Sequence, residues 1–534
     1  MLEFVNPATG RTFGGVAQAT AADVERARAE LAAAQPDWAA RPVRERVRAL
    51  RQLLGLIIDS VDVISQTINQ DTGKSRQDGL IEAFMLVERL SRYLRHAPRW
   101  LGPRPAPPSL YFTRRYAVRR RPYGVVAVLA PWNYPFDLLA SPALAALLAG
   151  NAVLVKPSEV AGATGALFEQ LIQNVAELAP YARVLHGDGR VGEMVVRSRP
   201  DLIYLTGSVG TARQIAQIAA ETLTPALFEL GGKDPMIVLA DADLEAAAHW
   251  GLWGAVYNAG QTCMAIERVY VERPAYDRFV ELAVAEAQRQ RAGYSPGRDC
   301  PFQLGPMSAE RQRQLVAAHL EDALAKGARI LTGGRFEGPF LEPTVVVDVD
   351  HGMQLMREET FGPVMPIMAV KDAAEALRLA NDSDYGLSGA VWSQDLGRAR
   401  RIAEQLEVGA VSINDTLSHF AVPQLPFGGL KQSGNARTHS EQDVLQFSQT
   451  QALSSGRPPL PFDIATLMRR PGHYRLGKGL LRLAFGVTPR QRLEPLVEEV
   501  GRLRQEKRLA GPAAAAAGLL ALAAVLFGVW RARR

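Results

Sequence analysis

Residues 124–159 read GVVAVLAPWNYPFDLLASPALAALLAGNAVLVKPSE, and this stretch decides the fold class. Two short β-rich runs, 124–130 and 152–155, stand on either side of an Ala- and Leu-rich run that is typical of a helix. Similar β-rich runs recur along the chain at 181–185, 202–205 and 236–239. Strands that alternate with helices predict βαβ units, which build a parallel sheet covered by helices. The predicted fold class is therefore α/β.

The regions around this unit suggest more than one domain. A chain of 534 residues is too long for one compact core and predicts two or three domains. Residues 21–99 have apolar side chains at three- and four-residue spacing, which predicts helices, and the basic run 111–121 (YFTRRYAVRRR) predicts an exposed strand. A second α/β series is expected over 231–430, and there is no internal repeat.

The C-terminal region differs from the rest of the chain. The folded body is expected to end near residue 453, because 454–463 (SSGRPPLPFD) is a Pro-rich linker pattern. Residues 509–530 then form a run of 22 residues without a charge. A helix of that length spans the roughly 30 Å hydrocarbon core of a bilayer, so the run predicts a transmembrane anchor. The alternative is an Ala-rich soluble helix, because Ala contributes little insertion energy and Pro512 interrupts the start of the run.

The positive charge of the chain is concentrated in this tail. Residues 457–534 carry 15 Lys and Arg against 5 Asp and Glu, a net charge of +10, whereas the whole chain has a net charge of +6. The sequence contains no zinc-ligand spacing or aromatic-basic RNA motif, so we do not expect a nucleic-acid partner. A basic segment beside an apolar one favours attraction to anionic lipid head groups.

Two cysteines, Cys263 and Cys300, offer no disulfide framework, which indicates a reducing compartment. The first residues lack the basic and apolar pattern of a signal peptide. We therefore expect a protein held in the membrane by a single C-terminal anchor, with its folded body facing the cytoplasm.

Two motifs carry residues suited to thiol chemistry. Glu229 stands in ELGGKDP, and Cys263 follows 34 positions later in NAGQTCMAIERVYV. Addition of a thiolate to an aldehyde, and hydrolysis of the thioester that results after oxidation, need a nucleophile and a base of this kind. A buried structural cysteine is the alternative for a cysteine taken alone. Cys300, in RDCPF, matches no motif.

Further motifs occur in a consistent order. Asn133 lies in APWNYPF, 23 residues before Lys156 in VLVKPSE; Gly207 lies in LTGSVGTAR; and Glu359 lies in REETFGPV, 96 residues after Cys263. PFGGLKQSGNAR follows at 426–437. With these motifs, residues 4–453 resemble the aldehyde dehydrogenase superfamily. Ala212 and Ala436 stand where glycine is usual in that superfamily.

The resemblance implies roles for particular residues. Cys263 is the nucleophile, Glu229 is the base that hydrolyses the thioester, and the side-chain amide of Asn133 stabilises the oxyanion. A Glu at position 229 further implies a free acid as product rather than a coenzyme A thioester. The residues that the resemblance assigns to the cofactor are Trp132, Lys156, Glu159, Gly207, Ser208, Glu359 and Phe361.

The cofactor and the architecture also follow from the resemblance. Glu159 would face the ribose 2′-hydroxyl, where a carboxylate repels a 2′-phosphate, so NAD is favoured and NADP remains an alternative. The implied parts are a Rossmann-like NAD(P)-binding domain (1–230) with a β arm near 103–122, a catalytic domain (231–430), the rest of the oligomerisation arm (431–453), a basic linker with an amphipathic segment (454–508), and the anchor (509–530). Family members form dimers or tetramers through the arm, and no metal is implied.

The substrate is less well defined. Phe136, Leu139, Met264 and Phe427 are the candidate channel residues, and they could accept an aliphatic chain or a phenyl ring, or be ordinary core. A membrane anchor similar to that of the fatty aldehyde dehydrogenases favours long-chain aldehydes. Aromatic aldehydes of the benzaldehyde type are the alternative substrate. A non-catalytic membrane-tethered scaffold and a coenzyme A-acylating enzyme are the alternative functions.

Overall fold

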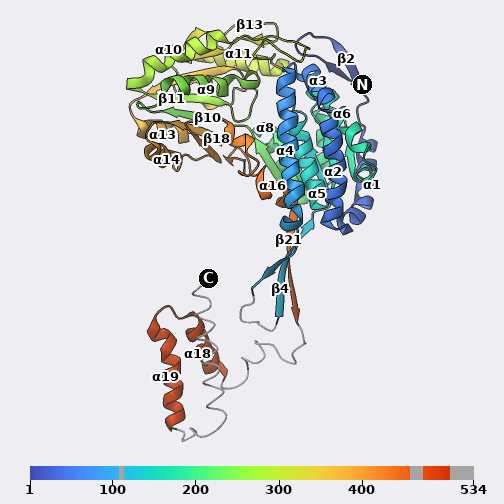
Figure 1. The fold of residues 1–534 in the computed structure, drawn as a ribbon, viewed down its shortest axis with the longest axis vertical. Coiled ribbons are helices and arrows are strands. Elements are labelled where there is room, and N and C mark those ends of the chain that lie inside the picture. The colour runs from blue at the N-terminus through green and yellow to red at the C-terminus, as the bar shows by residue number, and fades with distance from the viewer. Residues whose placement is uncertain (108–113, 457–468, 470–472, 506–534) are drawn as a thin grey trace. The chain divides into compact units, whose positions relative to one another are not determined.

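The computed structural model describes residues 1–107, 114–456, 469 and 473–505 (Figure 1). Internal contacts divide the chain into two units. The first contains residues 1–103 and 119–451, and the second contains residues 104–118 and 452–534. The sequence-predicted anchor, 509–530, lies outside the described residues. Among the helices that are described, none has the length and apolar character needed to cross a membrane.

The first unit begins with a small antiparallel sheet and a helical layer. The helices expected over 21–99 are present as α1 to α4. Thr20 starts α1 with a capping box, because its hydroxyl accepts from the Asp23 N–H while the Asp23 carboxylate accepts from the Thr20 N–H. Gly73, at φ 75°, ends α3 in the left-handed region that glycine favours. The bounds are β1 (Leu2–Val5), β2 (Thr12–Val16), α1 (Ala21–Ala40), α2 (Val43–Asp59), α3 (Val61–Thr72) and α4 (Arg76–Trp100).

The stretch at 124–159 forms a βαβ unit within a five-stranded parallel sheet, as its sequence predicts. The strand order is β7-β6-β5-β8-β9, and all four neighbouring pairs are parallel. All five residues of β5 are buried, because helices cover the sheet. The bounds are β5 (Val125–Leu129), α5 (Asp137–Ala149), β6 (Ala152–Lys156), α6 (Gly162–Gln173), β7 (Ala182–Val184), α7 (Gly189–Arg197), β8 (Leu202–Gly207), α8 (Val209–Thr222) and β9 (Ala226–Leu230).

A second sheet of seven strands follows, in the order β12-β15-β16-β11-β10-β18-β19, and only the β12–β15 pair is antiparallel. Its first strand begins at Asp234, four residues after β9 ends. The bounds are β10 (Asp234–Val238), α9 (Leu244–Val256), β11 (Ile266–Glu272), α10 (Arg273–Arg289), α11 (Glu310–Ala325), β12 (Arg329–Thr332), β15 (Thr344–Val347), α12 (Gln354–Arg357), β16 (Val364–Val370), α13 (Ala373–Asn381), β18 (Ser388–Trp392), α14 (Leu396–Ala403) and β19 (Ala410–Ile413).

Both faces of this sheet are covered. Met236 and Val238 of β10 pack in one apolar cluster with α9 and α10, whereas Ile237 between them packs in another with α13 and α14. Figure 1 shows the two helix pairs on opposite sides of β10 and β11. Successive side chains of a strand point to opposite faces, so a fully buried strand such as β10 requires helices on both sides.

Short elements complete the first unit. Their bounds are η1 (Glu159–Ala161), η2 (Ala179–Tyr181), η3 (Tyr257–Gly260), β13 (Phe336–Glu337), β14 (Phe340–Leu341), β17 (Tyr385–Gly386), α15 (Ser418–Ala421), β20 (Leu430–Lys431) and α16 (Ser440–Leu445).

The basic strand expected over 111–121 is present as β4 (Arg114–Pro122), in a three-stranded sheet of order β21-β4-β3 with β3 (Arg104–Ala106) and β21 (Ser448–Gly456). The second unit also contains α18 (His473–Phe485) and α19 (Pro489–Gln505), which are joined by an ion pair of 2.8 Å between Arg482 and Glu494.

Candidate active site

Glu229 lies in β9, and its carboxylate is buried without a partner. The residue is 2% exposed, and neither oxygen has a hydrogen bond of standard geometry. Burial raises its pKa from the usual 4.5 to about 8, and the neighbouring Cys263 side chain lowers that pKa only in part. A carboxylate of this basicity is suited to accept a proton from water near neutral pH.

Cys263 is half-buried and lies in the turn between η3 and β11. Burial raises the pKa of its thiol well above the usual value, and the carboxylates of Glu229, Asp234 and Glu359 raise it further. The thiol therefore keeps its proton at neutral pH unless a nearby base accepts it. The motif residues Glu229 and Cys263, 34 positions apart in sequence, are brought together by the fold.

The turn before Cys263 has an unusual backbone. Asn258 and Ala259 adopt left-handed conformations, with φ of 53° and 54°, and Gly260 follows at 70°. A Cβ on Gly260 would lie 2.1 Å from the backbone of Gly362, so the cysteine loop and the loop that carries Glu359 touch backbone to backbone. Only glycine permits so close an approach.

Asn133, after β5, reaches the same turn. Its Nδ2 donates to the Gln261 carbonyl at 3.1 Å, and its own carbonyl accepts from the Nζ of Lys74 at 2.6 Å and from the Nδ2 of Asn258 at 3.2 Å. The adjacent Tyr134 hydroxyl shares a hydrogen bond of 2.8 Å with the Thr262 hydroxyl. The side-chain amide of Asn133 is thus fixed two residues from Cys263.

The predicted cofactor residues of the first sheet lie at the carboxyl ends of its strands. Trp132 follows β5, Lys156 ends β6, and Gly207 ends β8, while Ser208 caps α8 by accepting from the Thr211 N–H. Because β6 and β8 flank β5 in a parallel sheet, these residues share one edge, which is where α/β folds bind nucleotides.

At that edge Lys156 is buried and paired, and Gly207 is loosely packed. The Nζ of Lys156 lies 3.0 Å from the carboxylate of Glu159, which is 42% exposed and open to solvent. A Cβ on Gly207 would meet no atom nearer than 3.4 Å, so the turn has room beside it. Ala212, where glycine is usual in the superfamily, is buried in the core under α8.

Glu359 and Phe361 come to the site from the second sheet. The Glu359 carboxylate accepts from the N–H of Gly232 at 3.3 Å, and a Cβ on Gly231 would lie 2.0 Å from its Oε1. The Phe361 ring meets the Trp132 ring edge-on, with centroids 5.7 Å apart. Glu359 fits closely against the glycine backbone, and the strand-end residues of the first sheet lie at the edge named above. This arrangement suits a dinucleotide whose ribose and nicotinamide lie between the two sheets.

The four candidate channel residues separate into two pairs. Met264 and Phe427 pack with Leu387 and Leu417 in a small apolar cluster, which we call the thiol-side cluster. Three partly buried side chains pack against it, and they are Cys263, Trp253 and Phe420.

Phe136 and Leu139 do not lie in the thiol-side cluster. Both belong to the core under the first sheet, and the Phe136 ring packs against Phe168 at 6.5 Å. The predicted channel role of these two residues is therefore not supported, because α5 turns this face toward its own sheet. Trp253, Leu417 and Phe420 were not predicted. The aromatic spacing Trp250, Trp253, Tyr257 along α9 was the available signal for the first of them.

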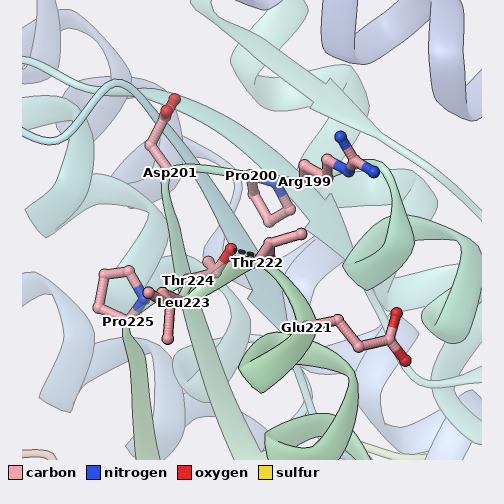
Figure 2. Close-up of a pocket in the computed structure, with 8 residues that line it drawn as sticks. All are labelled: Arg199, Pro200, Asp201, Glu221, Thr222, Leu223, Thr224 and Pro225. Carbon is pink, nitrogen blue, oxygen red and sulfur yellow. Dashed lines mark hydrogen bonds between the residues drawn. The ribbon is translucent and has the colours of Figure 1, made fainter.

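A hollow of about 580 Å³ lies elsewhere, as Figure 2 shows. It is lined by Arg199, Pro200 and Asp201, which precede β8, and by residues 221–225, which precede β9. The hydroxyls of Thr222 and Thr224 hydrogen-bond at 2.7 Å beside it. These segments lie at the amino ends of the strands, the edge opposite Glu229 and Gly207, so the hollow is not part of the candidate active site.

Comparison with known proteins agrees with this geometry. The model of the aldehyde dehydrogenase family matches residues 1–453. The chain belongs to the aldehyde dehydrogenase family. A 4,4'-diapolycopene aldehyde oxidase from Methylomonas is 40% identical over 485 residues, which cover 90% of this chain and 91% of the relative.

Solved structures of aldehyde dehydrogenases are also similar. Betaine aldehyde dehydrogenase from Staphylococcus aureus in complex with NAD+ has a TM-score of 0.82 and 29% identity, over 86% of this chain and 92% of that one. An NADP-dependent enzyme from Escherichia coli has a TM-score of 0.81 and 31% identity, over 85% and 94%. Proteins of this family use NAD or NADP, in agreement with the predicted cofactor.

Proposed function

We propose that this aldehyde dehydrogenase oxidises a hydrophobic aldehyde and water to the carboxylic acid, with reduction of NAD(P)+. The observation that supports this most directly is the unpartnered, buried carboxylate of Glu229 beside the Cys263 thiol. Burial of a carboxylate without a hydrogen bond lowers the stability of the fold. A catalytic role that uses the lone pairs of this carboxylate explains why such a group is present.

In the proposed reaction, Glu229 accepts the proton of Cys263, and the sulfur adds to the aldehyde carbon. The former aldehyde oxygen becomes negative in this step, and it faces the Nδ2 of Asn133 and the N–H of Cys263. A fixed donor at such a position is typically worth about 3 kcal/mol of barrier. A bound nicotinamide would supply the hydride acceptor, and loss of hydride from the tetrahedral carbon would leave a thioester on Cys263. Glu229 gives the first proton to solvent and then removes a proton from water as the water attacks the thioester; that proton passes to the leaving thiolate, so that the acid and the Cys263 thiol are restored.

The thiol-side cluster supports an apolar substrate. The cluster and the side chains packed against it comprise six residues other than Cys263, and none of the six is charged. Arg89 lies near this cluster, with its guanidinium 6.0 Å from the Phe420 ring, and is paired with the buried Asp137. A substrate carboxylate would have to compete with that ion pair, so a neutral hydrophobic aldehyde fits better. The relative named 4,4'-diapolycopene aldehyde oxidase is consistent with a long apolar substrate.

An aromatic aldehyde of the benzaldehyde type is the second candidate. The observation in its favour is the number of rings at the thiol side, where Phe420 and Phe427 meet edge-on at 4.9 Å. Edge-to-face rings of this kind could extend to a substrate phenyl group.

The first experiment measures NADH formation by the purified enzyme with straight-chain aldehydes of rising length and with benzaldehyde. We expect kcat/KM to rise with chain length. A higher kcat/KM for benzaldehyde would select the aromatic candidate, and no NADH from any aldehyde would contradict the proposed function. Glu229→Gln is expected to give at most one slowly formed equivalent of NADH per active site and then stop, because Cys263 must then give its proton to water and the thioester is not hydrolysed.

We also propose that residues 509–530 anchor the chain in a membrane, with the catalytic body in the cytoplasm. The support is the uncharged run of 22 residues and the net charge of +10 in the tail.

We further propose a homodimer or homotetramer formed through the three-stranded sheet of β3, β4 and β21, since a sheet edge offers unpaired N–H and C=O groups to a second copy.

A further inference from the structure

Glu267, in β11, holds the loop that carries Glu359 and Phe361. Its side chain is 4% exposed, and its two oxygens accept three strong hydrogen bonds. The donors are the N–H of Thr360 at 2.7 Å, the N–H of Phe361 at 2.8 Å and the Nζ of Lys233 at 2.6 Å. Glu267 lies inside the motif NAGQTCMAIERVYV, but the motif predicts no role for it, because Thr360 and Phe361 lie more than 90 residues away in the chain.

Lys233 connects this loop to the turn that carries the base. Its Nζ is fully buried, and besides Glu267 it donates to the Thr360 hydroxyl at 3.0 Å. The residue before it, Gly232, donates its N–H to the Glu359 carboxylate. Two bonds from Gly232–Lys233 and two from Glu267 therefore link the loop to the start of β10 and to β11.

The loop needs this support because its backbone is unfavourable. Phe361 has a φ of 52°, in the left-handed region that a bulky residue rarely adopts. Such a conformation costs about 1 kcal/mol or more and persists only where the surroundings enforce it. Glu267 accepts the N–H of Phe361 itself, so the restraint acts directly on the strained residue.

We propose that Lys233 and Glu267 form a positioning pair that fixes Glu359 and Phe361 for binding the nicotinamide half of NAD(P)+. The proposal rests on the cofactor roles given above to Glu359 and Phe361. The pair does not touch the cofactor; it acts through the loop. A Glu267→Gln side chain offers one acceptor oxygen and turns an NH2 group toward donors, so at least one restraint on Thr360 or Phe361 is lost.

The test measures cofactor binding by calorimetry, the KM for cofactor and for aldehyde, and the thermal midpoint of full-length variants. For Glu267→Gln we expect the cofactor Kd and KM to rise about 10- to 100-fold, as for a lost hydrogen bond to a charged group. The aldehyde KM should change by less than about threefold. Thr360→Val, which removes the hydroxyl contacts with Lys233 and His319 but keeps the backbone bond to Glu267, is the milder variant and should raise the cofactor Kd by roughly threefold to tenfold.

Glu272→Gln is the matched control. Glu272 lies in the same strand, is 5% exposed, accepts the Ala240 N–H at 2.7 Å and pairs with Arg398 at 2.7 Å, away from the loop. It should lower the thermal midpoint without changing the cofactor Kd. If Glu267→Gln behaves in the same way as this control, the pair is only structural and the proposal is wrong.

A double variant separates positioning from burial of charge. Lys233→Met with Glu267→Leu removes both charges, so we expect the thermal midpoint to recover relative to either single variant. The cofactor Kd should stay raised, since the loop still lacks its acceptor. Recovery of both quantities would overturn the proposal. Calorimetry measures cofactor binding without turnover, so it tests the positioning pair even if no aldehyde is oxidised. A lack of aldehyde oxidation would contradict the proposed function and not the positioning pair.

Discussion

At the scale of single residues, the site is governed by the burial of a few ionisable groups. Burial raises the pKa of the Glu229 carboxyl to about 8 and outweighs the opposite effect of the Cys263 side chain. The Cys263 thiol has its pKa raised mainly by burial. Both effects disfavour the charged forms, carboxylate and thiolate, that the reaction uses. A rise in pH should therefore increase activity and decrease stability.

Activity should rise with pH. The base form of Glu229 is a minority below pH 8, so kcat is expected to increase about tenfold per pH unit below that value and to level off above it. The measurement is a pH–rate profile with saturating aldehyde. A profile that is flat from pH 6 to pH 9 would remove Glu229 from the rate-limiting proton transfer.

Stability should fall over the same range. The folded chain holds the Glu229 proton to about pH 8, whereas an unfolded chain releases it near pH 4.5, so the folded state binds more protons between these values. The free energy of unfolding then decreases as pH rises. Glu229→Gln should be the more stable protein at pH 9, by up to about 5 kcal/mol, and nearly equal to the wild type at pH 4.5. Denaturant unfolding at both pH values measures this, and equal stabilities at pH 9 would contradict it.

At the scale of elements, loops from different sheets meet at close range. Gly260 must accept a left-handed backbone and also the contact with Gly362. Helices α4, α5 and α16 are joined by a buried network, in which Arg89 pairs with Asp137 and lies 3.2 Å from the Nε2 of His439.

Gly260→Ala tests the loop contact. Its Cβ would lie 2.1 Å from the Gly362 backbone, so we expect a loss of roughly 3 kcal/mol of stability and a large loss of kcat. Gly338→Ala is the control, because Gly338 has a φ of 57° and no atom within 4 Å of the added Cβ. That variant should lose only about 1 kcal/mol and keep its activity. Equal losses of stability in the two variants would mean that the left-handed backbone alone causes the destabilisation, and not the contact with Gly362.

Arg89→Met tests the helix network. Removal of the guanidinium leaves the buried Asp137 carboxylate unpaired, and we expect a loss of about 3–5 kcal/mol in the free energy of unfolding. Arg197→Met removes an exposed pair with Glu193 and should cost less than about 1 kcal/mol. Similar costs for both variants would show that the buried pair is not a significant source of stability.

At the scale of the whole molecule, the tail is expected to decide where the enzyme meets its substrate. A chain that ends at residue 508 should remain in the supernatant after ultracentrifugation, whereas the full chain should sediment with membranes. Both should oxidise a short soluble aldehyde with the same kcat/KM, because the catalytic residues are unchanged. A full chain that stays soluble without detergent would contradict the anchor.

The sequence by itself determined the α/β class, the order of the strands along the chain and the motif residues of the site. These follow from local patterns, since strand and helix periodicity and short motifs are properties of neighbouring residues. Glu229, Cys263 and Asn133 could be named because their motifs are short and ordered. Their burial and their proximity could not be deduced in the same way.

Only the tertiary structure decided which apolar residues lie beside the thiol. Phe136 and Met264 are both apolar and both follow a motif residue, yet α5 turns Phe136 into the core whereas Met264 packs with Phe427. The same holds for Lys233 and Glu267, whose bonds cross between β10, β11 and a loop more than 90 residues away. The raised pKa of Glu229 also depends on segments remote in sequence, because burial is produced by whatever packs around a side chain and not by its neighbours along the chain.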